Sequence, residues 1–167
     1  VDACHEHGIA VLVDVVFNHA GTGDNVLWAV APQSFFRGDT EWGAMINFEH
    51  PQVIHFFEQN LVHFMKHYRI DDFTHVIRYG HTWTDHVRVP GSAGGEMFLR
   101  KLKAAVRGVD ARCLMMAEEF PNDLSFTGSD SPMDTQWSDA FHDRLLDACK
   151  NENVMSSLAD ALKATQV

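Results

Sequence analysis

The chain has 167 residues, of which 46% are hydrophobic, and its 13 lysines and arginines against 23 aspartates and glutamates give a formal net charge of -10. This length and apolar content suit one globular domain with a substantial core. The charge argues against nucleic acid or an anionic membrane as a partner, and no apolar run approaches the roughly 18 residues that a membrane helix needs.

Three cysteines, Cys4, Cys113 and Cys149, are widely spaced and odd in number. They predict neither a disulfide framework nor a structural zinc site, and they favour a reducing, cytoplasmic location. The first residues, VDACHEHG, lack the basic stretch that opens a signal peptide. The first residue is Val rather than Met, so we expect the chain to be an excerpt of a longer protein.

Apolar runs and helical patterns alternate along the first half of the chain. Residues 9–15 form a nearly continuous β-branched run after Gly8, which predicts a strand covered on both faces. Residues 20–50 are rich in Gly, Asn, Asp and Pro and lack periodicity, which indicates a long functional loop. From Pro51 onward, apolar residues recur at helical spacing, and proline suits the first turn of a helix.

The same alternation continues in the second half. The elements predicted there are strands over residues 68–73, 112–118 and 133–137, and helices over about 97–106, 140–150 and 154–164. This order implies parallel strands joined by right-handed crossovers. It is compatible with a doubly wound sheet or with part of a (β/α)8 barrel.

Polar residues on the predicted strands and just after them decide between these folds. They are Asp14, Asn18 and His19 at the first strand, Arg69, Asp71 and Asp72 on the second, and Glu118 and Glu119 at the third. Polar groups at the C-terminal ends of successive parallel strands converge on one mouth, where barrel enzymes carry out their chemistry. No glycine-rich nucleotide fingerprint follows any strand. The sequence therefore predicts an α/β fold that is a partial TIM barrel.

Paired carboxylates at such a mouth suit cleavage of a glycosidic bond. One carboxylate attacks the anomeric carbon, while the other is kept protonated and donates to the leaving oxygen. The same residues could instead hold a divalent metal, so the chemistry alone leaves both interpretations open. The 11 histidines are scattered without a ligand array, and we assign them no metal.

Two motifs resemble conserved regions of the alpha-amylase superfamily of glycoside hydrolases. DVVFNH at residues 14–19 is similar to the first region of that family, and MMAEE at residues 115–119 is similar to its third. The framing stretch WGAMINFEHPQV also matches. The resemblance covers nearly the whole chain. It implies that residues 1–167 are the central part of a catalytic barrel, about strands three to six with their helices, with an excursion loop at about 20–50.

The resemblance also implies roles for single residues. Glu118 would be the general acid/base, Asp14 would brace the loop, and His19 would hydrogen-bond the sugar. Asn18 would fix the loop or bind calcium, and no other cofactor is expected. The substrate would be an alpha-glucan or maltooligosaccharide, in a retaining hydrolysis or transglycosylation of the amylase or branching-enzyme type. Among the tryptophans, Trp83 follows the second strand and is the best candidate for a sugar contact.

The nucleophile motif departs from the family pattern. The second region of the family runs approximately Asp-Gly-Phe-Arg-x-Asp, whereas residues 67–77 here read HYRIDDFTHVI. An ungapped count puts Asp71 at the leading aspartate and Val76 at the nucleophile, which removes the chemistry. A count back from FTHVI makes Asp72 the nucleophile after a deletion. A third option pairs Arg69 with Asp71 two residues later, which preserves the family spacing. We expect the nucleophile at Asp71 or Asp72, with Arg69 beside it in the substrate site.

Two other functions stay open at this point. Loss of the nucleophile would leave a noncatalytic carbohydrate-binding or interaction module derived from an amylase barrel. A metal-dependent barrel hydrolase would instead lose its activity in a chelator. Whatever the function, we expect this chain expressed alone to be inactive and poorly soluble, because part of a barrel exposes sheet edges and apolar strand faces.

Overall fold

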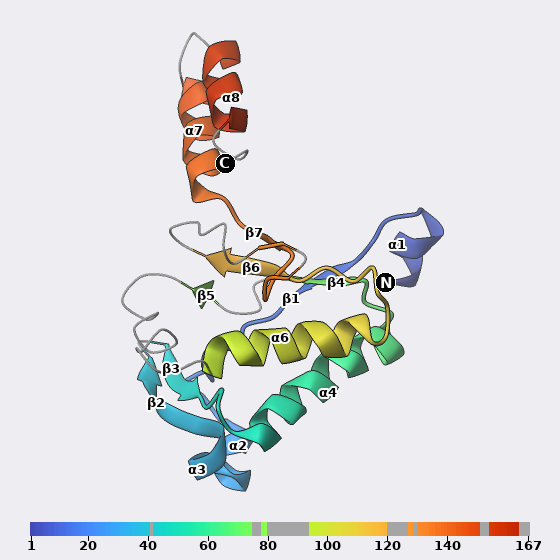
Figure 1. Cartoon of the computed structure of the whole chain (residues 1–167), viewed down its shortest axis with the longest axis vertical. Helices are drawn as coiled ribbons and strands as arrows, with labels where there is room; N and C mark the ends of the chain where they lie inside the picture. The colour runs from blue at the N-terminus through green and yellow to red at the C-terminus, as the bar shows by residue number, and fades with distance from the viewer. Residues whose placement is uncertain are drawn as a thin grey trace.

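The computed structural model describes residues 1–40, 42–74, 78–79, 94–119, 127–128, 130–150 and 154–163 (Figure 1). The helices are α1 (Asp2–Glu6), α2 (Val26–Val30), α3 (Pro32–Phe35), α4 (Pro51–Tyr68), α6 (Gly94–Arg107), α7 (Asp139–Lys150) and α8 (Val154–Lys163). The strands are β1 (Leu12–Asp14), β2 (Phe36–Thr40), β3 (Gly43–Ile46), β4 (Asp72–Thr74), β5 (Arg78–Tyr79), β6 (Met116–Glu119) and β7 (Thr135–Gln136).

Parallel strands form the centre of the molecule. β1 pairs with β4, with Val13 opposite Phe73. Phe73 also bridges to Met115, just before β6, and β6 pairs in parallel with both β5 and β7. Helix α4 is the last element before β4 in the connection from β1, and α6 lies between β5 and β6 in the chain. This arrangement confirms the predicted alternation of parallel strands and helices.

Helices α4 and α6 lie side by side along one face of the strands (Figure 1). The buried residues of α4 recur at the predicted spacing, and Pro51 occupies its first turn; they are Val53, Ile54, Phe57, Leu61 and Met65. The two helices meet through Phe57 and Phe98, whose rings are edge to face with centroids 5.6 Å apart. Both predicted helices are therefore confirmed, and their apolar stripes form the main core.

Strand β1 is covered on only one face by the described residues. Phe73 and Met115 are fully buried on the side of the helices. Leu12 alternates with Val13 along β1 and is 47% exposed. The prediction that residues 9–15 form a strand covered on both faces is therefore wrong, because only the Val13 side packs against the core.

The strand predicted over residues 68–73 is shorter and begins later than expected. Helix α4 continues to Tyr68, and Arg69 then adopts a left-handed conformation with φ 57°. The Arg69 N–H still donates to the Met65 carbonyl at 3.1 Å. Arg69 is therefore the C-terminal cap of a helix rather than a strand residue, and β4 begins only at Asp72.

Residues 20–50 contain regular structure where the sequence predicted a loop. Two short helices, α2 and α3, precede the antiparallel hairpin β2–β3. The hairpin is fastened to the segment that follows β1, since the Ala20 N–H donates to the Ala44 carbonyl at 2.9 Å and the Ile46 N–H donates to the Asn18 carbonyl at 3.2 Å. These bonds place an ordered hairpin next to the C-terminal end of β1.

The last two helices confirm the elements predicted at about 140–150 and 154–164. They pack against each other and stand away from the strands in Figure 1. In the part of the chain that the structure describes, no helix combines the length and apolar character needed to cross a membrane.

Candidate functional site

The predicted site residues separate into two groups at opposite ends of the strands. Asp14, Asn18, His19 and Glu118 lie at or after C-terminal ends, whereas Arg69, Asp71 and Asp72 lie at the N-terminal end of β4. Asp72 pairs in register with Leu12, the first residue of β1. Parallel strands share one direction, so the second group lies at the end of the sheet away from the first.

Asn18 and His19 form a fixed unit after β1. The side-chain oxygen of Asn18 accepts a hydrogen bond from His19 Nδ1 at 2.8 Å. Because an amide oxygen only accepts, Nδ1 carries the proton and Nε2 is the acceptor nitrogen of the neutral ring. The Asn18 carbonyl also accepts from Ile46 of β3. Asn18 therefore orients the imidazole and ties the loop to the hairpin.

Glu118 is the carboxylate of the C-terminal group that is withdrawn from solvent. It is 6% exposed and is the third of the four residues of β6. Its backbone pairs in parallel with Arg78 of β5. Asp14, by contrast, is exposed at the end of β1. A buried carboxylate close to the end of a parallel strand is in the position that acid/base residues take in barrel enzymes.

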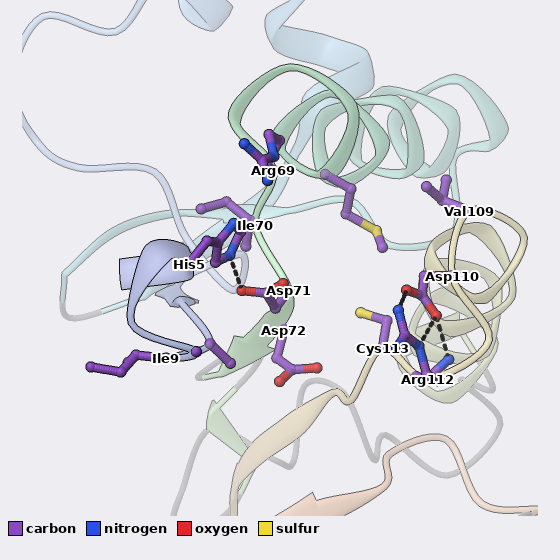
Figure 2. Close-up of a pocket in the computed structure, with 13 residues that line it drawn as sticks. His5, Ile9, Arg69, Ile70, Asp71, Asp72, Val109, Asp110, Arg112 and Cys113 are labelled. Atoms are coloured by element: carbon purple, nitrogen blue, oxygen red, sulfur yellow. Dashed lines mark hydrogen bonds and ion pairs between the residues drawn. The ribbon is translucent and has the colours of Figure 1, made fainter. Parts of the chain in front are cut away.

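The second group lines a hollow of about 640 Å³ at the start of the strands (Figure 2). Asp71 and Asp72 share it with His5, Arg69 and Cys113. Burial raises the pKa of the Cys113 thiol to about 12, so the thiol is protonated at neutral pH. The hollow therefore offers carboxylates and cations but no reactive thiolate.

Asp71 is held by groups that favour its charged form. Its Oδ2 accepts from the Val11 N–H at 2.7 Å and contacts His5 Nε2 at 2.8 Å. The Val11 N–H is the main reason that the pKa of Asp71 lies below its usual 3.8, while burial opposes this shift and His5 and then Arg69 add to it. Arg69 itself is directed to Asp2, with Nη1 and Oδ1 2.8 Å apart. The predicted pairing of Arg69 and Asp71 along one strand face is therefore not seen.

Asp72 connects two neighbouring strands. Its Oδ1 accepts from the Leu114 N–H at 2.7 Å. Since Phe73 bridges to Met115, Asp72 is level with Leu114, and Glu118 lies four residues further along the same strand. Four residues correspond to about 13 Å, whereas the carboxyl groups of a retaining pair are about 5 Å apart. The structure thus does not bring Asp71 or Asp72 together with Glu118.

This placement favours the count without a gap, in which Asp71 leads the motif. Val76, which that count assigns to the nucleophile, lies outside the described residues, as does Trp83. The nucleophilic role of Asp71 or Asp72 stays a prediction.

In the described ranges, no group of three or more His, Cys, Asp or Glu side chains is placed to hold a metal ion. The side-chain oxygen of Asn18 is engaged with His19, whereas calcium takes about six to eight oxygen ligands. Calcium binding by Asn18 stays a prediction, and no catalytic step below depends on it.

No family model matches this chain. Several curated proteins align with it, and their names are those of enzymes of alpha-glucan metabolism. It is 26% identical over 143 residues to a malto-oligosyltrehalose trehalohydrolase from Deinococcus radiodurans, covering 85% of this chain and 22% of the relative. It is 28% identical over 138 residues to the 1,4-alpha-glucan branching enzyme GlgB of Rhodopseudomonas palustris. This alignment covers 71% of this chain and 19% of the relative. The chain thus spans about a fifth of the length of these relatives.

Solved structures share the fold. A putative alpha amylase from Salmonella typhimurium matches with a TM-score of 0.70 and 22% identity, over 89% of this chain and 25% of that one. A cyclic alpha-maltosyl-(1→6)-maltose hydrolase from Arthrobacter globiformis matches with a TM-score of 0.70 and 20% identity. This match covers 98% of this chain and 39% of the hydrolase. The chain is thus similar in sequence to enzymes that act on alpha-glucans and in fold to alpha-amylases. Its α/β fold is that of the matched part of these enzymes.

Sequence reasoning preferred Trp83 among the tryptophans as a sugar contact and did not single out Trp42. Trp42 lies beside His19, with ring centroids 5.7 Å apart. The stretch WGAMINFEHPQV, in which Trp42 begins the match to the family, was the available signal. The proximity itself could not be seen, because it depends on how the hairpin is seated against residues 18–20.

The Asp71 carboxylate is expected to stabilise the fold only while it is charged. Its folded pKa is lowered below 3.8, so its contribution is complete above that value and is lost as the pH falls through the folded pKa. Asp71→Asn should reduce the free energy of unfolding at neutral pH by less than about 1 kcal/mol, because the side chain is 37% exposed and solvent screens it.

Urea denaturation of both proteins between neutral pH and pH 3 checks this. The difference between wild type and Asp71→Asn should shrink toward the acid end. Asp24→Asn, at an exposed carboxylate, is the control. A difference that stays constant over this pH range would contradict the assignment.

Proposed function

We propose that this protein works as a retaining enzyme on alpha-glucans, either hydrolysing them or transferring a glucan chain to an acceptor. The observation that carries the proposal is the buried Glu118 near the C-terminal end of β6, in a parallel sheet where Asn18 and His19 follow the end of β1. In this proposal β1, β4 with β5, β6 and β7 correspond to strands three to six of a (β/α)8 barrel. The names of the relatives support maltooligosaccharides as the substrate class.

The mechanism assigns Glu118 two successive proton transfers. It first protonates the leaving glycosidic oxygen, and it then takes a proton from water or from the hydroxyl group of an acceptor sugar. His19, oriented by Asn18, is positioned to accept a hydrogen bond from a sugar hydroxyl through Nε2. A retaining site also requires a carboxylate nucleophile about 5 Å from Glu118.

A noncatalytic carbohydrate-binding or interaction module is the second candidate. It is favoured by the contacts of the two candidate nucleophiles, since Asp71 accepts from Val11 and Asp72 accepts from Leu114 at the start of the strands. Such contacts stabilise a fold without requiring chemistry. This candidate keeps alpha-glucan as the ligand and loses turnover.

Separate Asp71→Asn and Asp72→Asn variants of the full-length protein distinguish the two candidates. If one aspartate is the nucleophile, its variant should lose maltooligosaccharide turnover by about 10³-fold or more, while still binding maltoheptaose. Asp110→Asn is the matched control, because Asp110 lines the same hollow and pairs with Arg112.

Unchanged rates in both variants would remove Asp71 and Asp72 from the mechanism and leave the enzyme proposal with another nucleophile. Glucan binding by the full-length wild type without any turnover would replace the enzyme by the binding module. Loss of activity in a chelator would instead indicate a metal-dependent hydrolase.

A further inference from the structure

We propose that Trp42 is a stacking platform for one glucose unit of the alpha-glucan, held beside His19 by the hairpin β2–β3. The inference deepens the proposed function and rests on it for the substrate class. It adds a binding residue, at the C-terminal end of the strands, that neither conserved motif contains.

The neighbouring side chains supply complementary surfaces. The rings of Trp42 and His19 are tilted by 35° with centroids 5.7 Å apart, and Trp42 is 38% exposed. An indole ring offers a flat apolar face to the C–H groups of a pyranose, and a sugar lying on it directs its hydroxyls toward the rim. His19 provides a polar nitrogen at that rim. The pair therefore presents one stacking surface and one hydrogen-bonding group to the same ligand.

The turn that carries Trp42 is held by its own hydrogen bonds. The Trp42 N–H donates to Thr40 Oγ1 at 3.2 Å, and the Thr40 hydroxyl donates to the Gly43 carbonyl at 2.6 Å. Strand β3 of the hairpin also pairs with the segment after β1, through the antiparallel backbone bridge between His19 and Met45. A platform fixed in this way loses little conformational entropy when a ligand binds.

Gly43 explains why the hairpin can lie so close to His19. Its φ is 142°, and a Cβ atom at this position would lie 1.9 Å from the Ala20 carbonyl oxygen. Only glycine fits this contact and this backbone conformation without strain. The two neighbouring residues thus have separate roles. Gly43 lets the hairpin pack against the Ala20 backbone next to His19, and Trp42 places its ring beside the His19 imidazole.

Trp28 provides a matched comparison within the same region. It is 50% exposed on α2, but it stacks on Phe36 with ring centroids 4.5 Å apart. It therefore shares the size and exposure of Trp42 without lying beside His19. A general effect of removing a surface tryptophan would appear in both positions.

The test measures maltoheptaose binding by calorimetry and by tryptophan fluorescence for the wild type, Trp42→Ala, Trp42→Phe and Trp28→Ala. We expect Trp42→Ala to weaken binding by about tenfold and to remove the ligand-induced fluorescence change, whereas Trp28→Ala should keep both. Trp42→Phe retains an aromatic face, so it should lose less affinity than Trp42→Ala. Thermal melts of all four proteins show whether each variant is folded.

Two results would overturn the inference, and they are distinguishable from each other. If the wild type binds and folded Trp42→Ala binds equally well, Trp42 is not a platform, although the proposed function stands. If the wild type binds no alpha-glucan, both the platform and the proposed function fail. Should Trp42→Ala not fold, Trp42→Phe decides alone, and a Phe variant with an unchanged fluorescence response would overturn the role of the indole ring.

Discussion

Replacing Glu118 by glutamine in the full-length protein is expected to reduce maltooligosaccharide turnover by about 10²- to 10⁴-fold, the usual contribution of a general acid/base. Glutamine keeps the shape of the side chain in its buried position near the end of β6. It has no acidic proton to give to the leaving oxygen and no carboxylate to activate water. Steady-state rates on maltoheptaose, with circular dichroism to verify folding, measure the effect.

A substrate whose leaving group needs no protonation separates chemistry from structure. A maltosyl fluoride should form the glycosyl-enzyme intermediate in Glu118→Gln much more readily than maltoheptaose does, because fluoride departs without an acid. A variant that is slowed equally on both substrates would point to a structural role for Glu118. Glu119→Gln, at the adjacent carboxylate, is the control and should keep most of the activity.

Replacing Lys103 by methionine is expected to lower the free energy of unfolding by about 3 kcal/mol. Lys103 lies on the apolar side of α6, and its side chain is only 8% exposed. Its Nζ is 2.9 Å from Asp134 Oδ1 and donates to three carbonyl oxygens, those of Gly128, Ser131 and Met133. Methionine fills the space but leaves these buried acceptors without their common donor.

Asp134 links Lys103 to the strands, so the loss of Lys103 should also weaken the packing of α6 against β6. It also accepts from Arg107 and from the Met115 N–H, which directly precedes β6. Urea denaturation of Lys103→Met measures the loss. Lys101→Met, at an exposed position of the same helix, should change stability by less than about 0.5 kcal/mol. Equal urea midpoints for the two variants would show that the contacts of Lys103 with Asp134 and the three carbonyl groups do not stabilise the packing of α6 on the strands.

The helices could be predicted from the sequence because their signal is local and long. Apolar residues at helical spacing from Val53 to Met65 gave α4, and a first-turn proline marked its beginning. The end of α4 was placed too early, because a strand was predicted to begin at Tyr68, whereas the helix includes that residue. No residue type announces that Arg69, which is not a glycine, takes a left-handed conformation.

The site was predicted less well because it depends on which end of a strand a residue occupies. Asp71 and Asp72 were placed on a strand, but β4 begins at Asp72, and this moves both carboxylates to the far end of the sheet from Glu118. Lys103 gave a usable signal, since it is a charged residue in an apolar stripe with Leu99, Leu102 and Val106. The contact of Trp42 with His19 joins residues from separate elements, and spacing carries no information about it.

The pairing of β1 with β4 sets the order in which this chain can acquire its structure during synthesis. The two strands meet across a sequence separation of 60 residues. At the ribosomal pace of about 5–20 residues per second, β1 emerges about 3–12 s before its partner. The hairpin β2–β3 needs only neighbouring residues and forms in microseconds. The hairpin β2–β3, next to Trp42, can therefore form before β1 has paired with β4.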